Sequence, residues 1–419
     1  MLISVGRSPV NGRAAAPASK SYSVRGLMCA ALSPGTSRII GPLESDDTQA
    51  AREVLAEIGV KIGSAGGDWV VEGGHFAAPT RDLFCRDSAA TLRFMMALCC
   101  LVPGPCRLTS GESLRRRPEG TLIEALKKWG ANLSGEGPYP PVTVRGGELR
   151  GGWTSLRGDI SSQFVSALLL VAPLARSAST IHLTSGLESK AYVAMTEQCL
   201  NRFGVGIESS PDLVDFVISP QPYRAAEYLV EGDWSSASYL LALGGVAGEM
   251  EVTNLDPGSL QPDKALVDLL RDMGAGVEIR EGGVRVSRGQ LTGISADLNE
   301  CIDLLPTVAV LAGLAEGTSE LRGLARARLK ESDRVASVRA GLDRLGIKVK
   351  EESDKLIING GKMVPGEVDA MSDHRIAMAF SLAGAACGGV KIRGAECVSK
   401  TFPEFWDTLR GLGVKIDEQ

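Results

Sequence analysis

VLAEIGVKI, at residues 54–62, is the first of six similar stretches that decide how this chain folds. The others are ALKKWGANL (125–133), CLNRFGVGI (199–207), LLRDMGAGV (269–277), GLDRLGIKV (341–349) and TLRGLGVKI (408–416). Each predicts an amphipathic helix, a glycine in the left-handed conformation at the helix end, and then a β-strand. The six glycines lie 67 to 74 residues apart, which indicates six repeats of one unit.

A second series of helices is predicted between these stretches. Each member opens on a polar residue and is apolar around most of its circumference, which is typical of a buried helix that begins at a polar surface. The series is SYSVRGLMCAAL, SAATLRFMMALCC, SSQFVSALLLVAP, SSASYLLALGGVA, DLLPTVAVLAGLA and HRIAMAFSLAGAA, beginning near residues 21, 88, 161, 235, 303 and 373. β-branched runs such as TIHLTS and EVTNL predict strands between the helices.

The repeat thus predicts an α/β unit with two helices and several strands. Six units suit two pseudo-threefold domains of three units each. A solenoid is the alternative, but solenoid repeats are usually about 20–50 residues long and need capping repeats, which this sequence does not show. From the phase of the repeat we expect one domain at residues 19–229 and another at 1–17 plus 231–419, with hinges near 17–19 and 229–232.

Composition argues against several classes of protein. Of the 419 residues, 45 are Lys or Arg and 50 are Asp or Glu, a net charge of −5 that argues against a general nucleic-acid-binding protein. Apolar runs such as 94–102 are about half as long as a membrane span requires, and the N-terminus has no signal-peptide pattern. Nine cysteines without a Cys-x-x-Cys pair and three dispersed histidines favour neither disulfides nor zinc. We expect a reduced, cytoplasmic protein without a metal.

The predicted helix starts point to an anionic ligand. If the buried helices of a domain run parallel, their N-termini converge and their free N–H groups attract anions, and two such faces across a hinge would form a cleft. Cations at helix starts are disfavoured by the helix dipole, so a bound anion would offset that cost. Five cations are expected at such positions, Arg117 as a cap before Pro118: Lys20, Arg117, Arg334, Arg375 and Lys400.

Two segments combine groups suited to a phosphorylated substrate. SSQ (161–163) offers two hydroxyls and backbone amides for a phosphate and a side-chain amide for a sugar-like hydroxyl, with simple helix capping as the alternative. RLKESDR (328–334) brings acid, amine and guanidinium groups together within about one helical turn and its approach, with a salt-bridged helix start as the alternative. No glycine-rich phosphate loop accompanies them.

Eight motifs then give the chain a family resemblance. In this order, SKSYSVR, LRRRP, SSQF, LESKAY, EGDWSSASY, LKESDR, SDHRIAMAF and SKTFPEF resemble the 5-enolpyruvylshikimate-3-phosphate synthase family, across the chain from Lys20 to Phe405. The resemblance implies a two-domain inside-out α/β barrel of six βαβαββ repeats, three per domain, in agreement with the repeat analysis. It implies a transferase that moves the enolpyruvyl group of phosphoenolpyruvate to the 5-hydroxyl of shikimate 3-phosphate and releases phosphate, a step of the shikimate pathway to chorismate and aromatic amino acids. No cofactor, a monomer, and no nucleic-acid or membrane partner are the family expectations.

The resemblance also implies the site residues. Those expected to contact shikimate 3-phosphate are Lys20, Ser21, Arg25, Ser161, Ser162, Gln163, Ser189, Asp303 and Lys330. Those expected around phosphoenolpyruvate are Lys20, Ala89, Arg117, Gln163, Arg334, Arg375 and Lys400. The first domain would form the shikimate 3-phosphate side and the second the phosphoenolpyruvate-clamping side, closing around the substrate.

The chemistry explains these residue types. The hydroxyl must lose a proton while C3 of phosphoenolpyruvate gains one, and the resulting tetrahedral intermediate expels phosphate, so a base and an acid are needed. The resemblance assigns Asp303 as the proton acceptor and Glu331 as the donor, with Lys20 assisting. Glu331 must then be protonated near neutral pH. The arginines would offset charge on the carboxylate and on the departing phosphate.

Some positions depart from the family pattern. DSAATLR (87–93) replaces the family's N-[AS]-G-T-x-x-R, so Ala89 stands where relatives have a glycine against phosphoenolpyruvate and the inhibitor glyphosate. Its methyl group should shorten the pocket and reduce glyphosate sensitivity. Ala90 replaces a threonine, and Arg326 stands where some relatives have an asparagine against the substrate phosphate.

Three alternative functions are weighed against this one. A UDP-N-acetylglucosamine enolpyruvyl transferase would use a reactive cysteine, but Cys99, Cys100 and Cys106 lie in or just beyond an apolar helix, where packing is expected. A nucleic-acid-binding or RNA-end-processing protein of related architecture is opposed by the acidic net charge and by the lack of interleaved aromatic and basic residues. A non-catalytic binding homologue is opposed by the presence of Lys20, Asp303, Glu331 and Lys400.

Overall fold

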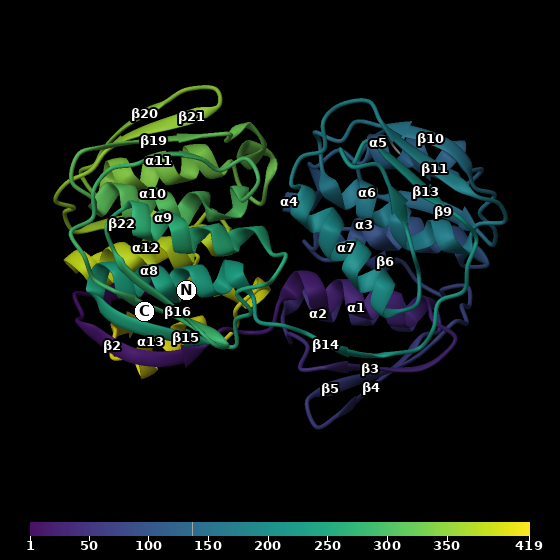
Figure 1. Cartoon of the computed structure of the whole chain (residues 1–419), viewed down its shortest axis with the longest axis horizontal. Coiled ribbons are helices and arrows are strands. Elements are labelled where there is room, and N and C mark those ends of the chain that lie inside the picture. The colour runs from purple at the N-terminus through teal and green to yellow at the C-terminus, as the bar shows by residue number, and fades with distance from the viewer. Residues whose placement is uncertain (136) are drawn as a thin grey trace. The chain divides into compact units, whose positions relative to one another are not determined.

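A computed structural model describes residues 1–135 and 137–419. Their internal contacts divide the chain into two units (Figure 1): residues 18–230, called the N-terminal unit, and residues 1–17 with 231–419, called the C-terminal unit. Within the described residues, each unit contains three four-stranded sheets. No helix of the described residues is long and apolar enough to cross a membrane.

The six sheets share one pattern of pairing. An edge strand pairs in parallel with an inner strand, which pairs antiparallel with a second inner strand, which pairs antiparallel with the other edge strand. In the N-terminal unit the orders are β14 (Glu227–Leu229)–β3 (Gly35–Ile40)–β5 (Asp68–Gly73)–β4 (Lys61–Ala65), β6 (Leu83–Phe84)–β7 (Gly104–Thr109)–β9 (Val142–Gly146)–β8 (Asn132–Gly135), and β10 (Gly152–Leu156)–β11 (Ser179–Leu183)–β13 (Asp215–Ile218)–β12 (Glu208–Ser209). In the C-terminal unit they are β2 (Val10–Ala15)–β15 (Gly248–Thr253)–β17 (Gly283–Ser287)–β16 (Gly276–Arg280), β18 (Ser295–Asp297)–β19 (Thr318–Arg322)–β21 (Lys355–Asn359)–β20 (Lys348–Glu351), and β22 (Gly366–Asp369)–β23 (Val390–Arg393)–β1 (Leu2–Gly6)–β24 (Lys415–Glu418).

The buried helices form the interior of each unit. They are α1 (Lys20–Leu32), α3 (Ala89–Leu98) and α6 (Ser162–Val171) in the N-terminal unit, and α8 (Trp234–Ala247), α10 (Leu305–Leu314) and α12 (His374–Cys387) in the C-terminal unit. Every residue from Leu305 to Gly313 is buried, as the apolar circumference of this segment predicts. All six helices begin within two residues of the predicted positions, which confirms this series.

The second helix of each repeat is confirmed as well. These helices are α2 (Asp46–Glu57), α5 (Gly120–Lys128), α7 (Lys190–Arg202), α9 (Leu266–Asp272), α11 (Arg334–Arg344) and α13 (Phe405–Gly411). The six repeat glycines after them all have φ between +78° and +98°, the left-handed conformation that glycine adopts without strain. The remaining short helices are α4 (Glu112–Arg115), η1 (Cys99–Leu101), η2 (Ala172–Leu174), η3 (Pro262–Ala265), η4 (Ile302–Leu304), η5 (Ala325–Leu329) and η6 (Ala395–Lys400).

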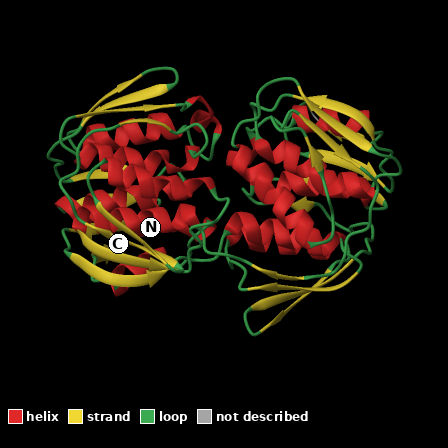
Figure 2. Ribbon diagram, viewed as in Figure 1, coloured by secondary structure: helices red, strands yellow, loops and turns green. Residues whose placement is uncertain are grey.

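Figure 2 shows, within each unit, helices in the interior and strands at the outside, the inside-out arrangement that was predicted. Three repeats are contiguous βαβαββ units, for example β6–α3–β7–α5–β8–β9. The other three are completed by distant strands: β14 pairs with β3, β2 pairs with β15, and β1 inserts between β23 and β24. Each sheet keeps two edge strands, so the described residues form open sheets around helices rather than a closed barrel.

Two predicted helix starts are wrong. Arg117 is not a helix cap, because its backbone N–H closes a turn onto the Leu114 carbonyl at 3.0 Å and α5 begins only at Gly120. Lys400 is the last residue of η6, and α13 begins at Phe405. Pro403 explains why α13 begins only after it, because the helical conformation is disfavoured for the residue before a proline.

Candidate active site

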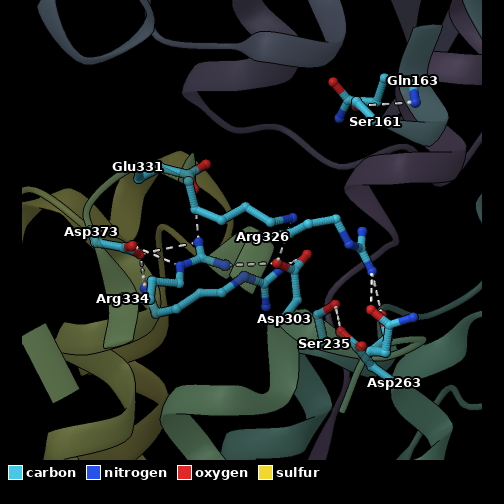
Figure 3. Close-up of polar contacts among 12 residues, drawn as sticks. Ser161, Gln163, Ser235, Asp263, Asp303, Arg326, Glu331, Arg334 and Asp373 are labelled. Carbon is cyan, nitrogen blue, oxygen red and sulfur yellow. Dashed lines mark hydrogen bonds and ion pairs between the residues drawn. The ribbon is translucent and has the colours of Figure 1, made fainter. Parts of the chain in front are cut away.

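Seven charged side chains of the C-terminal unit form what we call the carboxylate–cation cluster, part of which is labelled in Figure 3. They lie on η4, around the start of α11, at the start of α12 and at the end of η6. Four cations face three carboxylates, which leaves one positive charge in excess. The members are Asp303, Lys330, Glu331, Arg334, Asp373, Arg375 and Lys400.

Arg334 is the centre of the cluster. Its side chain is only 1% exposed, and its three nitrogens contact three carboxylates. Nη1 lies 2.6 Å from Asp303 Oδ1, Nη2 2.8 Å from Glu331 Oε2, and Nε 2.8 Å from Asp373 Oδ2. Burial alone would lower the pKa of Arg334, but the three carboxylates outweigh burial and raise it.

Asp303 joins two further cations to the cluster. Lys330 Nζ lies 3.3 Å from its Oδ1 and Arg375 Nη2 lies 3.1 Å from its Oδ2. Burial raises the pKa of Asp303, but Arg375, Lys330 and Arg334 together hold it well below the usual range for an aspartate. Burial also lowers the pKa of Lys330, against the opposing attraction of Asp303.

Glu331 lies between two cations. Its Oε2 accepts a hydrogen bond from Arg334, and its Oε1 lies 3.2 Å from Lys400 Nζ. Both side chains of the second pair are largely buried, at 12% and 11% exposed. The proton donor expected at Glu331 therefore contacts two cations of the cluster.

Asp373 contacts the two cations that lie at the starts of α11 and α12, Arg334 and Arg375. It is fully buried as the N-cap of α12, and its Oδ1 accepts from the Arg375 backbone N–H at 3.0 Å. Its Oδ2 accepts from Ser332 Oγ at 3.1 Å as well as from Arg334. Carboxylates of the protein thus offset the cost of placing cations at these helix starts, which the sequence had suggested a bound anion would offset. An anionic ligand has to compete with these carboxylates for the cations.

A second buried carboxyl, Asp263 on η3, lies near the cluster. Ser235 Oγ donates to its Oδ2, while its Oδ1 has no hydrogen-bond partner among the described residues. Burial raises the pKa of Asp263 to about 7, and the negative charge of Asp303 adds to the shift. Asp263 was not predicted from the sequence, because no pattern distinguishes it from the acidic residues of an ordinary helix start.

Lys20 is the first residue of α1 in the N-terminal unit. Ser19 caps the helix by accepting from the Tyr22 N–H at 3.4 Å, and Lys20 Nζ lies 3.0 Å from Asp47 Oδ2. Asp47 is buried near the start of α2 and is a second residue that the sequence analysis missed.

Arg25, one turn further along α1, is only 2% exposed. Its Nε donates to Thr196 Oγ1 at 2.8 Å, and Nη1 and Nη2 donate to the carbonyls of Ser21 and Tyr192 at 3.1 Å each. The bonds to Thr196 and Tyr192 join α1 to α7, and burial lowers the pKa of Arg25. Arg25 therefore has a structural role within this unit beside the one the resemblance implies.

Other predicted residues of the N-terminal unit lie at helix starts. Ala89 and Ser162 are the first residues of α3 and α6, and both are buried. Ser189 precedes α7 with a left-handed φ of +53°, an unusual conformation for a serine. Arg117 is 8% exposed and lies between α4 and α5.

Ser161 and Gln163 are brought together by a residue that the sequence analysis did not assign to the site. Arg93, on α3, donates from Nη1 to Gln163 Oε1 at 2.9 Å and to Ser161 Oγ at 3.2 Å. Glu119, with no exposed side-chain surface, holds the other side of the guanidinium group. Arg93 and its two partners are 68 and 70 residues apart in sequence, so these bonds join the buried helices of two successive repeats.

The predicted residues thus fall into distinct contact groups. The C-terminal unit brings Asp303, Lys330, Glu331, Arg334, Arg375 and Lys400 into one cluster. In the N-terminal unit, Lys20 pairs with Asp47, Ser21 with Arg25, and Ser161 with Gln163. Cys99, Cys100 and Cys106 are fully buried, and burial raises the pKa of Cys100 to about 12, which supports packing rather than reactivity.

Comparisons with known proteins agree with the motifs. The family model described as EPSP synthase (3-phosphoshikimate 1-carboxyvinyltransferase) matches residues 5–409. A 3-phosphoshikimate 1-carboxyvinyltransferase of Dehalococcoides mccartyi is 47% identical over 99% of both chains, and one of Methanothermobacter thermautotrophicus is 40% identical over 97% of both. A solved EPSP synthase structure from Acinetobacter baumannii covers all of both chains with a TM-score of 0.84 and 26% identity.

Proposed function

The chain belongs to the EPSP synthase family, and from this membership we propose that it transfers the enolpyruvyl group of phosphoenolpyruvate to the 5-hydroxyl of shikimate 3-phosphate. Phosphate is the second product, and the reaction proceeds by addition and elimination through a tetrahedral intermediate. The observation that supports the proposal is the carboxylate–cation cluster, in which Asp303 and Glu331, the proposed base and acid, contact four cations.

The cations of the cluster suit phosphoenolpyruvate, which carries a carboxylate and a phosphate. Arg334, Arg375 and Lys400 can donate charge-assisted hydrogen bonds to these groups and to the phosphate as it leaves. In exchange they give up contacts with Asp303 and Glu331. Arg117 in the N-terminal unit is the further cation that the resemblance assigns to this substrate.

This exchange of partners prepares the two carboxyl groups for proton transfer. When Arg375 turns toward a substrate anion, Asp303 loses part of the attraction that keeps it a weak base, and it becomes better able to accept the proton of the hydroxyl group. When Arg334 and Lys400 turn toward the anion, Glu331 loses two cations and gains a negative neighbour. Both changes favour its protonated form, which can then deliver a proton to C3 of phosphoenolpyruvate.

The N-terminal unit supplies the residues proposed for shikimate 3-phosphate. Ser161, Ser162 and the amide of Gln163 lie at the start of α6, where backbone N–H groups favour a phosphate. Lys20, Ser21, Arg25 and Ser189 are the other members in this unit, and Asp303 and Lys330 those in the C-terminal unit. A monomer and a cytoplasmic location remain predictions.

Phosphate release tests the proposal. Purified protein is incubated with phosphoenolpyruvate and, separately, with shikimate 3-phosphate or UDP-N-acetylglucosamine as acceptor. Release with shikimate 3-phosphate alone is expected. Release with the nucleotide sugar alone would assign the chain to the other enolpyruvyl transfer reaction. Saturable binding of shikimate 3-phosphate without release would indicate a binding homologue.

A further inference from the structure

The environment of Arg93 fixes its guanidinium group on one side. Nε donates to Glu119 Oε1 at 3.1 Å and Oε2 at 2.9 Å, and Nη2 donates to Oε1 at 2.9 Å. The ring of Phe164 lies 4.8 Å from the guanidinium carbon. The side chains of Arg93 and Glu119 are 9% and 0% exposed. A paired, stacked and buried guanidinium group has one orientation, which leaves Nη1 pointing away from Glu119.

Nη1 then determines which end of the Gln163 amide it meets. A guanidinium group only donates hydrogen bonds, so the amide oxygen Oε1 must face it, and it does so at 2.9 Å. The amide nitrogen Nε2 consequently points the other way. Among the described residues Nε2 has no hydrogen-bond partner, so both of its N–H groups are available to a ligand.

The same nitrogen constrains the Ser161 hydroxyl. Ser161 Oγ accepts from Arg93 Nη1 at 3.2 Å and from the Gln163 backbone N–H at 3.3 Å. With its acceptor capacity used in this way, the hydroxyl keeps its own O–H as a donor. Arg93 therefore presents both neighbours as donors.

We propose that Arg93 is a positioning residue that holds Gln163 and Ser161 in the donor orientation required by a substrate phosphate, carboxylate or hydroxyl oxygen. The inference rests on the proposed function for the identity of the substrates, although the orientation of the two side chains follows from Arg93 itself. Glu119 contributes to this positioning, because its bonds to Arg93 fix the orientation of the guanidinium group. Without Arg93 the Gln163 amide can turn through half a rotation and present its carbonyl oxygen to an anion, which repels it.

A double-mutant cycle tests whether Arg93 acts through Gln163. The variants are Arg93→Lys, Gln163→Ala and the double variant, with kcat and KM measured for both substrates. Lysine keeps the charge beside Glu119 but cannot also reach two acceptors in the fixed directions of a guanidinium group. Arg93→Lys is expected to reduce kcat/KM by about 10- to 100-fold in the parent, as loss of charged hydrogen bonds does, and by less than about threefold in the Gln163→Ala background. An equal loss in both backgrounds would show that Arg93 only supports the fold, and would overturn the inference.

A second variant separates orientation from stability. In Gln163→Glu a carboxylate oxygen still accepts from Arg93, but the outward amide donors are replaced by an acceptor. We expect it to keep the thermal midpoint of the parent within a few degrees while losing more activity than Gln163→Ala. Activity equal to the parent would refute a donor role for Nε2. Arg107→Lys, at an exposed arginine paired with Asp82, is the matched control and should match the parent.

A direct binding measurement distinguishes failure of the positioning role from failure of the proposed function. Shikimate 3-phosphate binding is measured by calorimetry for the parent and for the members of the cycle. If the parent binds it but releases no phosphate, the catalytic proposal fails, whereas coupling between Arg93→Lys and Gln163→Ala in the binding constants still supports the positioning role. Additive binding losses together with normal turnover by the parent would overturn the positioning role alone.

Discussion

Replacing Asp303 by asparagine separates its two proposed duties. Asparagine has nearly the same shape but can neither accept the proton of the hydroxyl group nor attract Lys330, Arg334 and Arg375 as a charge. Loss of the base should lower kcat. Loss of the negative charge should free the cations for phosphoenolpyruvate and lower its KM. The two constants are therefore expected to fall together.

The structure sets the size of both effects. A general base is worth about 10²- to 10⁴-fold in rate, which is the expected loss in kcat. The Asp303 Oδ2 to Arg375 Nη2 distance of 3.1 Å corresponds to a gross attraction of about 5 kcal/mol at an effective dielectric constant of 20. Most of this is offset by the cost of burying the carboxylate, so we expect a net gain for the anion of about 1 kcal/mol, or roughly a fivefold lower KM.

The assay is phosphate release at saturating shikimate 3-phosphate over a range of phosphoenolpyruvate concentrations. Circular dichroism and thermal unfolding establish that the variant is folded. Asp407→Asn is the matched control, because Asp407 is an 80% exposed aspartate paired with Arg410 and its charge should not affect either constant.

Two results would refute this reasoning. A folded Asp303→Asn variant with kcat within tenfold of the parent would show that another group accepts the proton. A tenfold or greater rise in the KM for phosphoenolpyruvate would show that Asp303 holds the cations in the geometry that binds the substrate, rather than competing with it.

Two further outcomes follow from buried groups. The pKa of Asp263 is about 7 in the folded chain against its usual 3.8, so the folded state binds more protons than the unfolded state between these values and stability falls as pH rises from about 4 to 7. Asp263→Asn should remove about 3 kcal/mol of the stability difference between pH 5 and pH 8 in urea unfolding, and an unchanged difference would contradict the shift. Ala89→Gly should lower the inhibition constant of glyphosate by roughly tenfold, since one methyl group in a tight pocket is worth about 1–3 kcal/mol, and no change would contradict a pocket shortened by Ala89.

Much of the fold could be predicted because its signals are local. A helix that ends at a left-handed glycine needs only a Leu-x-x-x-Gly pattern, and all six repeat glycines have positive φ. The strands that complete three of the repeats from a distance could not be predicted from local signals. Strands β1, β2 and β14 pair with partners far away along the chain, and pairing of that kind is determined by tertiary packing rather than by any local pattern.

In the candidate site, too, some residues could be predicted from a local pattern and others could not. The cations Arg334 and Arg375 stand out in the sequence because positive charge at a helix start opposes the helix dipole. Their partners do not stand out, because Asp373 resembles any N-cap and Asp303 any acidic residue before a buried helix. Arg93 stands out as a charged residue within an apolar helix, but its role was missed because its partners Glu119 and Gln163 lie 26 and 70 residues away along the chain.

The pairing of cations with carboxylates also changes what the cations imply. A cluster of bare cations would bind anions tightly and hold the product phosphate as well as the substrate. If Arg334, Arg375 and Lys400 bind the substrate as proposed, each anion must displace Asp303 or Glu331 from them, so binding is weaker but alters the proton affinity of the displaced carboxyl group. Substrate binding and proton transfer are then coupled through the same ion pairs. Departure of phosphate restores those pairs, which favours release of the product and returns both carboxyl groups to their starting state.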